Sequence, residues 1–210
     1  MKKTIIVLVS TFICSLTIAQ NFEGIIIYKN SFKSKSPNVT DMQFEQMMGS
    51  REEFYIKNGD YKSVRNGTFY QWSLYVNKEN KFYSKLSNSD TLYWDDAGSN
   101  TDTVLKVEVN REAINILGYK CDELILTCKN GIQKHYFNSK LHVDPNLYVK
   151  HKFANWYDYL LKSQSLPLKS IVEYEQFILE MVATEVKEMK LSESFFDLPI
   201  NSKSKKNPYQ

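Results

Sequence analysis

Apolar residues are densest near the middle of the chain, in two β-type runs between residues 117 and 141. The runs are joined by Asn130-Gly131, a dipeptide that tolerates the positive φ angles of a tight type I′ hairpin turn. The first run, Tyr119–Cys128, has apolar side chains at both odd and even positions. Because a strand that is apolar on both faces is usually covered on both faces, this hairpin is predicted to lie in the middle of a sheet.

The N-terminal half alternates between apolar and polar residues, as half-buried antiparallel strands do. A strand is predicted at Phe22–Phe32, and a meander of strands is predicted between Glu52 and Asp96, where turn residues recur at intervals of roughly 8–12 residues. A further strand is expected at Val104–Val109. Within the meander, Thr68–Val76 has one apolar face, formed by Tyr70, Trp72, Leu74 and Val76, and Phe82 marks a face of the next strand.

A short helix is predicted after Thr40, because Gln43 follows it three residues later and completes a capping box, while Gly49 supplies a C-terminal stop. Its apolar residues Phe44, Met47 and Met48 fall on one helical face. Two interpretations remain open: the helix plugs the core of the domain, or it is a lid over an apolar cleft, since methionine adapts to irregular partners.

A longer amphipathic helix is predicted between Asn146 and Gln164, with Asp144 as its cap and Pro145 at its first position. Trp156 and the leucines of this segment are expected to pack on the sheet. From Leu168 to Leu191 the pattern alone does not separate strand from helix, because Glu, Lys, Met and Ala favour a helix where the alternation favours a strand.

The first 19 residues resemble a secretory signal peptide, with Lys2 and Lys3 before an apolar run and a small-x-small cleavage site ending at Ala19. Export to the periplasm or beyond is therefore expected, leaving residues 20–200 as a single domain and residues 201–210 as a disordered basic tail. An N-terminal membrane anchor is the alternative, although the apolar run is short for a spanning helix, which needs ~20 residues. A lipidated Cys14 is a further alternative, but Ile13 stands where a lipobox has a small residue.

Two cysteines remain after such cleavage, Cys121 and Cys128. Seven residues along one strand span roughly 23 Å, whereas the Cα atoms of a disulfide lie within about 7 Å. The two are therefore predicted to be buried free thiols on opposite faces of their strand.

No motif of known catalytic or metal-binding chemistry is evident. His135, His142 and His151 lack the spacing of zinc ligands and are expected at the surface. The acidic loop around Asp95 and Asp102 lacks the alternation of a calcium loop, and no serine lies in a nucleophile elbow. The net charge of +3 falls to +1 without Lys2 and Lys3, which gives no electrostatic signature for nucleic acid. A protein without enzymatic activity, cofactor or metal is expected, with no transmembrane segment after the signal peptide.

Five short pieces together resemble a family of exported bacterial proteins of unknown function, whose folds are like those of the periplasmic lipoprotein carrier and its outer-membrane receptor (LolA/LolB-like). The pieces are Phe22–Tyr28, Ile116–Cys121, Leu166–Lys169, Met181–Val186 and Phe195–Pro199. The resemblance implies a mainly β (α+β) domain, in which a curved antiparallel sheet forms an incomplete barrel and one short and one longer helix cover its concave side. It also implies strands between Leu168 and Leu191, and it transfers no catalytic residues.

An incomplete barrel either leaves an apolar cleft on its hollow side or fills that side with its own aromatic residues. The cleft would suit a lipid, an acyl chain or a lipidated partner, since each buried methylene contributes ~0.8 kcal/mol. The expected function is thus a non-catalytic periplasmic or secreted binding protein; the alternative is a cell-envelope structural or interaction protein with a fully packed core and no small ligand. The candidate ligand-binding residues are Phe44, Met47, Met48, Tyr70, Trp72, Leu74, Val76, Phe82 and Trp156.

Overall fold

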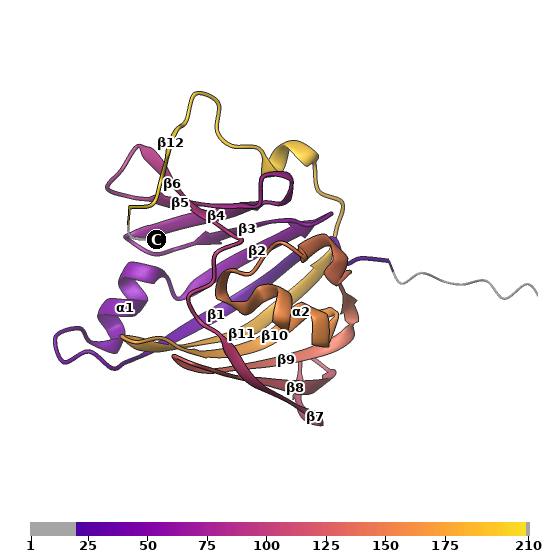
Figure 1. The fold of residues 1–210 in the computed structure, drawn as a ribbon. Helices are drawn as coiled ribbons and strands as arrows, with labels where there is room; N and C mark the ends of the chain where they lie inside the picture. Colours follow the sequence, from indigo (N-terminus) through magenta and orange to yellow (C-terminus); the bar gives the residue numbers. More distant parts are fainter. Residues whose placement is uncertain (1–19, 209–210) are drawn as a thin grey trace, which may run out of the picture.

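A computed structural model describes residues 20–208, so the predicted signal peptide lies outside the described residues. The described chain forms one 12-stranded sheet that bends around a central segment (Figure 1). The helices are α1 (Asp41–Met48) and α2 (Trp156–Ser163), with 3-10 turns η1 (Asn77–Glu79), η2 (Pro145–Tyr148), η3 (Phe153–Asn155) and η4 (Glu193–Phe196). In chain order the strands are β1 (Gly24–Ser34), β2 (Arg51–Lys57), β3 (Asp60–Arg65), β4 (Tyr70–Val76), β5 (Lys81–Leu86), β6 (Thr91–Asp96), β7 (Val104–Ile116), β8 (Tyr119–Cys128), β9 (Gly131–His142), β10 (Ser165–Glu173), β11 (Phe177–Glu188) and β12 (Lys203–Lys206).

Neighbouring strands are antiparallel throughout the sheet except where β12 pairs in parallel with β6. The order is β12-β6-β5-β4-β3-β2-β1-β11-β10-β9-β8-β7, so β12 and β7 form the two ends and the sheet does not close. This confirms the predicted mainly β fold with an open, curved antiparallel sheet. The ambiguous segment after Leu168 forms β10 and β11, as the resemblance implied.

The predicted β8–β9 hairpin forms, with Cys128 opposite Gly131, but two details differ from the prediction. The turn residues Lys129 and Asn130 do not have positive φ; the left-handed two-residue turns are Asn58-Gly59 and Leu117-Gly118. The hairpin also lies next to the β7 end of the sheet rather than in its middle. Leu124 and Leu126 are buried on one face, whereas Ile125 on the other face is only half-buried. This part of the strand is therefore fully covered on one face only.

The sheet has a core on each of its two faces. The larger core lies on the concave face and includes Ile26, Tyr28 and Phe54, which belong to the paired strands β1 and β2. The smaller core lies on the convex face of β4 to β6, where the C-terminal segment places Leu191 and Phe196 against the sheet.

Both cysteines are free and buried, as predicted. They lie in the same concave core, so the prediction of opposite strand faces is wrong. The pairing of β7 with β8 also shifts register next to Cys121, between Asn110 and Ile114.

The short helix α1 has the predicted boundaries, and its capping box is confirmed. Gln43 donates its backbone N–H to Thr40 Oγ1 at 3.2 Å, and Thr40 donates its own to Gln43 Oε1 at 2.8 Å. The prediction of a longer second helix is wrong, because only eight residues, Trp156–Ser163, are α-helical. Ala154 and Asn155 adopt left-handed φ angles of 54° and 60°, which break the segment in its middle.

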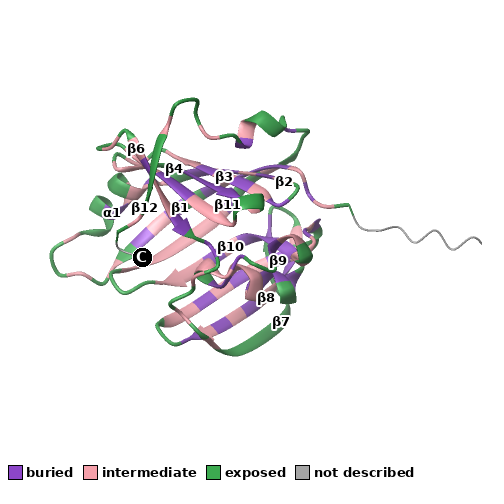
Figure 2. Cartoon of the chain, turned by 45° about the horizontal axis from the view of Figure 1, so that its top comes forward, coloured by how far each residue is buried: buried purple, intermediate pink, exposed green. Residues whose placement is uncertain are grey.

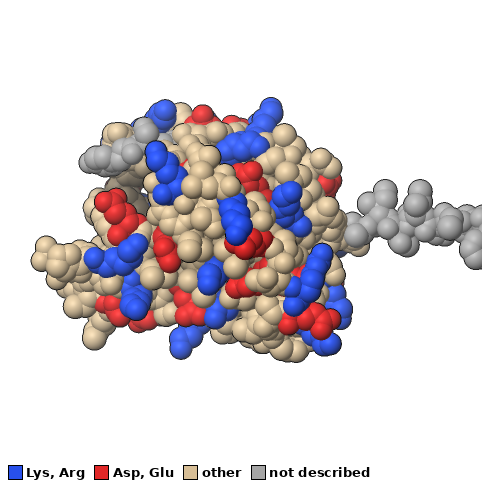
Figure 3. Space-filling model, turned by 60° about the horizontal axis from the view of Figure 1, so that its bottom comes forward, with Lys and Arg blue, Asp and Glu red and all other residues tan. Residues whose placement is uncertain are grey.

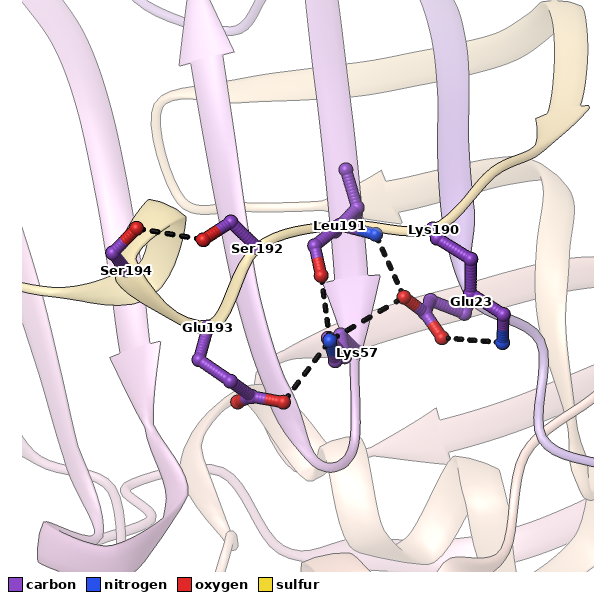
Figure 4. A network of polar contacts seen from close by, with 7 residues as sticks. All are labelled: Glu23, Lys57, Lys190, Leu191, Ser192, Glu193 and Ser194. Atoms are coloured by element: carbon purple, nitrogen blue, oxygen red, sulfur yellow. Dashed lines mark hydrogen bonds and ion pairs between the residues drawn. The ribbon is translucent and has the colours of Figure 1, made fainter.

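The end of the chain crosses the convex face and is fastened there by charged groups (Figure 4). Glu23 accepts the backbone N–H of Leu191 at 2.7 Å and pairs with Lys190 at 3.0 Å, while Lys57 Nζ donates to the Leu191 carbonyl at 2.5 Å. The bond from Leu191, reinforced by Lys190, holds the pKa of Glu23 below its ordinary value. Beyond this point, residues 203–206 pair with β6, which corrects the predicted disorder of that stretch.

Candidate functional site

The hollow side of the sheet is occupied by the protein's own residues 143–164, here called the plug, which connect β9 to β10 and include α2 (Figure 1). Tyr148, Tyr159 and Leu160 from the plug are almost completely buried. Asp144 starts the segment by accepting the N–H of Asn146 at 2.9 Å, in the role of a cap that the sequence predicts for it.

The turn between β4 and β5 and the loop after β6 hold the plug by hydrogen bonds to its backbone groups. Ala97 O accepts the N–H groups of Lys152 and Phe153 at 2.7 and 2.9 Å. Asn77 and Asn80, at the turn between β4 and β5, donate their side-chain amides to carbonyls of residues 147 and 150. These bonds satisfy irregular backbone at the concave face and fix its position.

The centre of the site is a stack of aromatic rings between β3, β4 and the plug. His151 lies 4.2 Å from Tyr75 and 5.8 Å from Tyr61, measured between ring centroids. The Tyr61 hydroxyl is 2.6 Å from His151 Nε2. Trp156 lies 5.8 Å from the Tyr61 ring, which joins α2 to the same stack.

A second buried histidine, His135 on β9, lies 4.5 Å from the Tyr159 ring, with Nδ1 2.9 Å from Ser170 Oγ. The prediction of surface histidines is therefore wrong for His135 and His151. Alternation along β9 points His135 inward together with Phe137, and the plug turns His151 toward the sheet.

The interior is electrically neutral around these rings. Burial lowers the pKa of His151 to about 3 and that of His135 to about 4, so both rings are uncharged near pH 7. Burial also raises the pKa of Tyr61 well above its ordinary value. The stack can therefore donate and accept hydrogen bonds but carries no charge at neutral pH.

Beside the C-terminal end of α1, where Asn30 donates its side-chain amide to Gly49 O at 3.4 Å, the concave face is polar. The buried Glu52 and the half-buried Arg65 form an ion pair at 2.9 Å, and Asn30 donates its side-chain amide to Glu52 at 3.4 Å. Burial alone would raise the pKa of Glu52, but the charge of Arg65 holds it below its ordinary value. Arg65 also lies over the Tyr70 ring, 4.8 Å from its centroid.

The nine candidate residues do not line one cleft. Phe82 and Trp156 lie in the concave core, each near Tyr61, and Tyr70 contacts Arg65 in the polar region. Phe44 packs on Phe177 at 4.8 Å, Met48 is half-buried, and Met47 is exposed. The other three, Trp72, Leu74 and Val76, belong to the convex core under Leu191 and Phe196.

A register shift explains the division within β4. The pairing of β4 with β5 slips between Tyr70 and Trp72, so the alternation that joined these residues in the sequence does not hold in the sheet. Leu74, Tyr75 and Val76 are all buried. Three apolar residues in succession are the signal in the sequence that both faces of β4 are covered.

Two surface hollows, of about 410 and 310 Å³, have mixed linings, in which charged residues stand beside apolar ones such as Phe137 and Phe22. The larger lies near Arg111, Lys120 and Lys162, and the smaller near Glu23 and Lys190. Cationic and anionic side chains are interspersed on the face in Figure 3. Within residues 20–208, no group of His, Cys, Asp and Glu side chains is arranged to hold a metal ion. None of the helices in that range has the length and apolar character needed to cross a membrane.

No protein-family model and no curated protein matches this chain. Among solved structures, one described as the structure of PNGF-II in space group P21 aligns over 87% of this chain with 16% identity and a TM-score of 0.48. The chain spans 31% of the length of that protein. A likeness at this level carries no argument about function, so function is inferred from the contacts within the chain itself.

Proposed function

We propose that this protein is an exported, non-catalytic interaction protein of the cell envelope, whose core is filled by its own plug and which contacts partners through its outer surface. The observation that carries the proposal is the burial of Tyr148, Tyr159 and Leu160 on the concave face, where a hydrophobic ligand would otherwise lie. A carrier site needs an apolar cavity of several hundred Å³.

The region beneath α1 supports the same proposal. A lid over an acyl chain needs an apolar floor, because an alkyl chain cannot satisfy buried polar groups. Here Phe44 fills the space under the helix by packing on Phe177, and Glu52, Arg65 and Asn30 lie beside the C-terminal end of the helix. The lipid-carrier function expected from the sequence stays a prediction, and the packing favours the alternative with a filled core.

The test is native mass spectrometry of the protein expressed with residues 1–19 and purified from the exported fraction without detergent. A mass equal to that of the polypeptide, in several preparations, is the expected result. A bound lipid or acyl chain of constant mass would overturn the proposal in favour of the carrier.

A matched pair of variants sharpens this test. Trp156→Ala truncates a side chain in the concave core, and Trp72→Ala truncates one in the convex core. Both are expected to lower the free energy of unfolding, by roughly 3 kcal/mol each, without changing the binding of a fluorescent fatty acid. A selective change in fatty-acid binding for Trp156→Ala would contradict the filled-core proposal.

A further inference from the structure

The two ends of the sheet differ in whether another strand covers them. At one end β6 is covered by β12, which the chain itself supplies. At the other end, no segment within residues 20–208 pairs with the outer side of β7. An unpaired edge presents backbone N–H and C=O groups to which another strand can add.

β7 also exposes apolar side chains along this edge, and it is exposed over most of its length (Figure 2). Leu105, Val107 and Val109 are 68%, 38% and 43% exposed. Register shifts flank the run from Lys106 to Asn110, which pairs regularly with β8. This run is therefore the straight part of the edge, and a second strand would fit along it.

In an antiparallel pair of two copies of this run, residues of opposite charge would face each other. In an antiparallel pair with a two-fold axis at Val107, Lys106 lies opposite Glu108 of the second copy, and Leu105 lies opposite Val109. Opposite charges facing each other across an antiparallel pair are stabilising and like charges are destabilising. Within one chain Lys106 and Glu108 lie on the same side of the strand, 2.9 Å apart, so in a pair their four charges would alternate.

We propose that β7 is a homodimer interface, in which two copies of this chain add edge to edge in an antiparallel register centred on Val107. This interface rests on the proposed interaction function. It specifies the surface, which is the β7 edge, and the partner, which is a second copy of this chain. The chain's own β12 does not cover this edge, because it pairs with β6 at the opposite end of the sheet. A second copy is favoured over an unrelated strand because a two-fold pair requires this reversal symmetry of charge, whereas an unrelated strand does not.

The contact is small for a protein interface, so the dimer is expected to dissociate on dilution in the micromolar range. Light scattering after gel filtration at rising concentrations measures this directly. A shift from monomer to dimer mass is expected; a constant monomer mass at several hundred micromolar would overturn the proposal.

Disulfide trapping tests the register. Val107→Cys places the two introduced thiols opposite each other at the axis, and both native cysteines are buried. Mild oxidation is expected to yield a covalent dimer. Val109→Cys is the matched control, because its two thiols would be offset by four residues, roughly 13 Å, beyond the reach of a disulfide. Equal cross-linking of both variants would overturn the register.

Charge reversal separates pairing from folding. Lys106→Glu and Glu108→Lys, each at an exposed position, are expected to weaken the dimer at least tenfold, and the double variant is expected to restore it. Circular dichroism checks that each variant folds. Failure of the double variant to recover would contradict the facing of Lys106 and Glu108.

These results are independent of the lipid test. A monomeric protein without lipid would remove the β7 dimer and leave the interaction function standing, with a different partner. A dimer that carries lipid would keep the interface and remove the filled-core proposal.

Discussion

Two histidines in the core connect the stability of this protein to pH. Since burial lowers the pKa of His151 to about 3 and of His135 to about 4, the folded state binds fewer protons than the unfolded state below pH 6.5. Stability is therefore fully present above pH 6.5 and is lost as the pH falls toward the folded pKa values. For His135 the full loss amounts to roughly 3 kcal/mol, at 1.4 kcal/mol for each pH unit.

We predict that the free energy of unfolding in urea falls between pH 7.5 and pH 4.5, and that His135→Phe removes part of this fall. Phe137→Leu, on the same buried face of β9 but without a titratable group, serves as the control and is expected to keep the full pH dependence. An unchanged pH dependence in His135→Phe would show that this ring is not the source.

Removing only the cation from the ion pair of Glu52 and Arg65 is predicted to lower the free energy of unfolding more than removing both charges. Arg65→Met leaves a buried carboxylate without its cation, which costs about 3–5 kcal/mol. The double variant Glu52→Gln with Arg65→Met removes both charges, and most of that loss is expected to be recovered. Urea unfolding of the single and double variants measures this; a loss below about 1 kcal/mol for Arg65→Met would mean that the pair behaves like an exposed one.

At the scale of elements, the C-terminal segment is predicted to stabilise the sheet through one buried ring rather than through its last strand. Phe196 packs in the convex core, so Phe196→Ala is expected to cost about 3 kcal/mol. Deleting residues 201–210 is expected to cost less than about 1 kcal/mol, because every residue of β12 is exposed. Ile200→Ala, at a 92% exposed position, is the control and should change nothing. A larger loss from the deletion than from Phe196→Ala would contradict this.

Elements with strong local signals could be predicted from the sequence, and those fixed by distant contacts could not. The capping box at Thr40 defines α1 without help from the rest of the fold. The helix expected between Asn146 and Gln164 fails at Ala154 and Asn155, whose left-handed conformation accompanies bonds from Lys152 and Phe153 to the distant Ala97. No local pattern contains that information.

The same limit applies to the candidate site. Alternation placed Trp72 and Tyr70 together, but a register shift in the pairing of β4 with β5 separates them. Phe82 and Trp156 are partly buried and pack against the concave core, in line with the prediction that Trp156 packs on the sheet. Whether they line a cleft or fill it depends on the path of the plug, which composition does not specify.

At the scale of the whole molecule, we infer that the plug is a permanent part of the core. An open sheet of this size must cover its concave face, and the chain does so with residues 143–164, held by Ala97, Asn77 and Asn80. The outer surface, including the β7 edge, is then what remains for partners.

Amide hydrogen exchange of the plug, measured with and without a phospholipid or fatty acid, tests this claim most directly. Slow exchange at Tyr157 and Gln164, whose N–H groups are bonded to carbonyls of His151 and Leu160, is expected to be the same in both samples. Fast exchange of these amides in the free protein, slowed when lipid is added, would show instead that the plug is a lid that closes over a ligand.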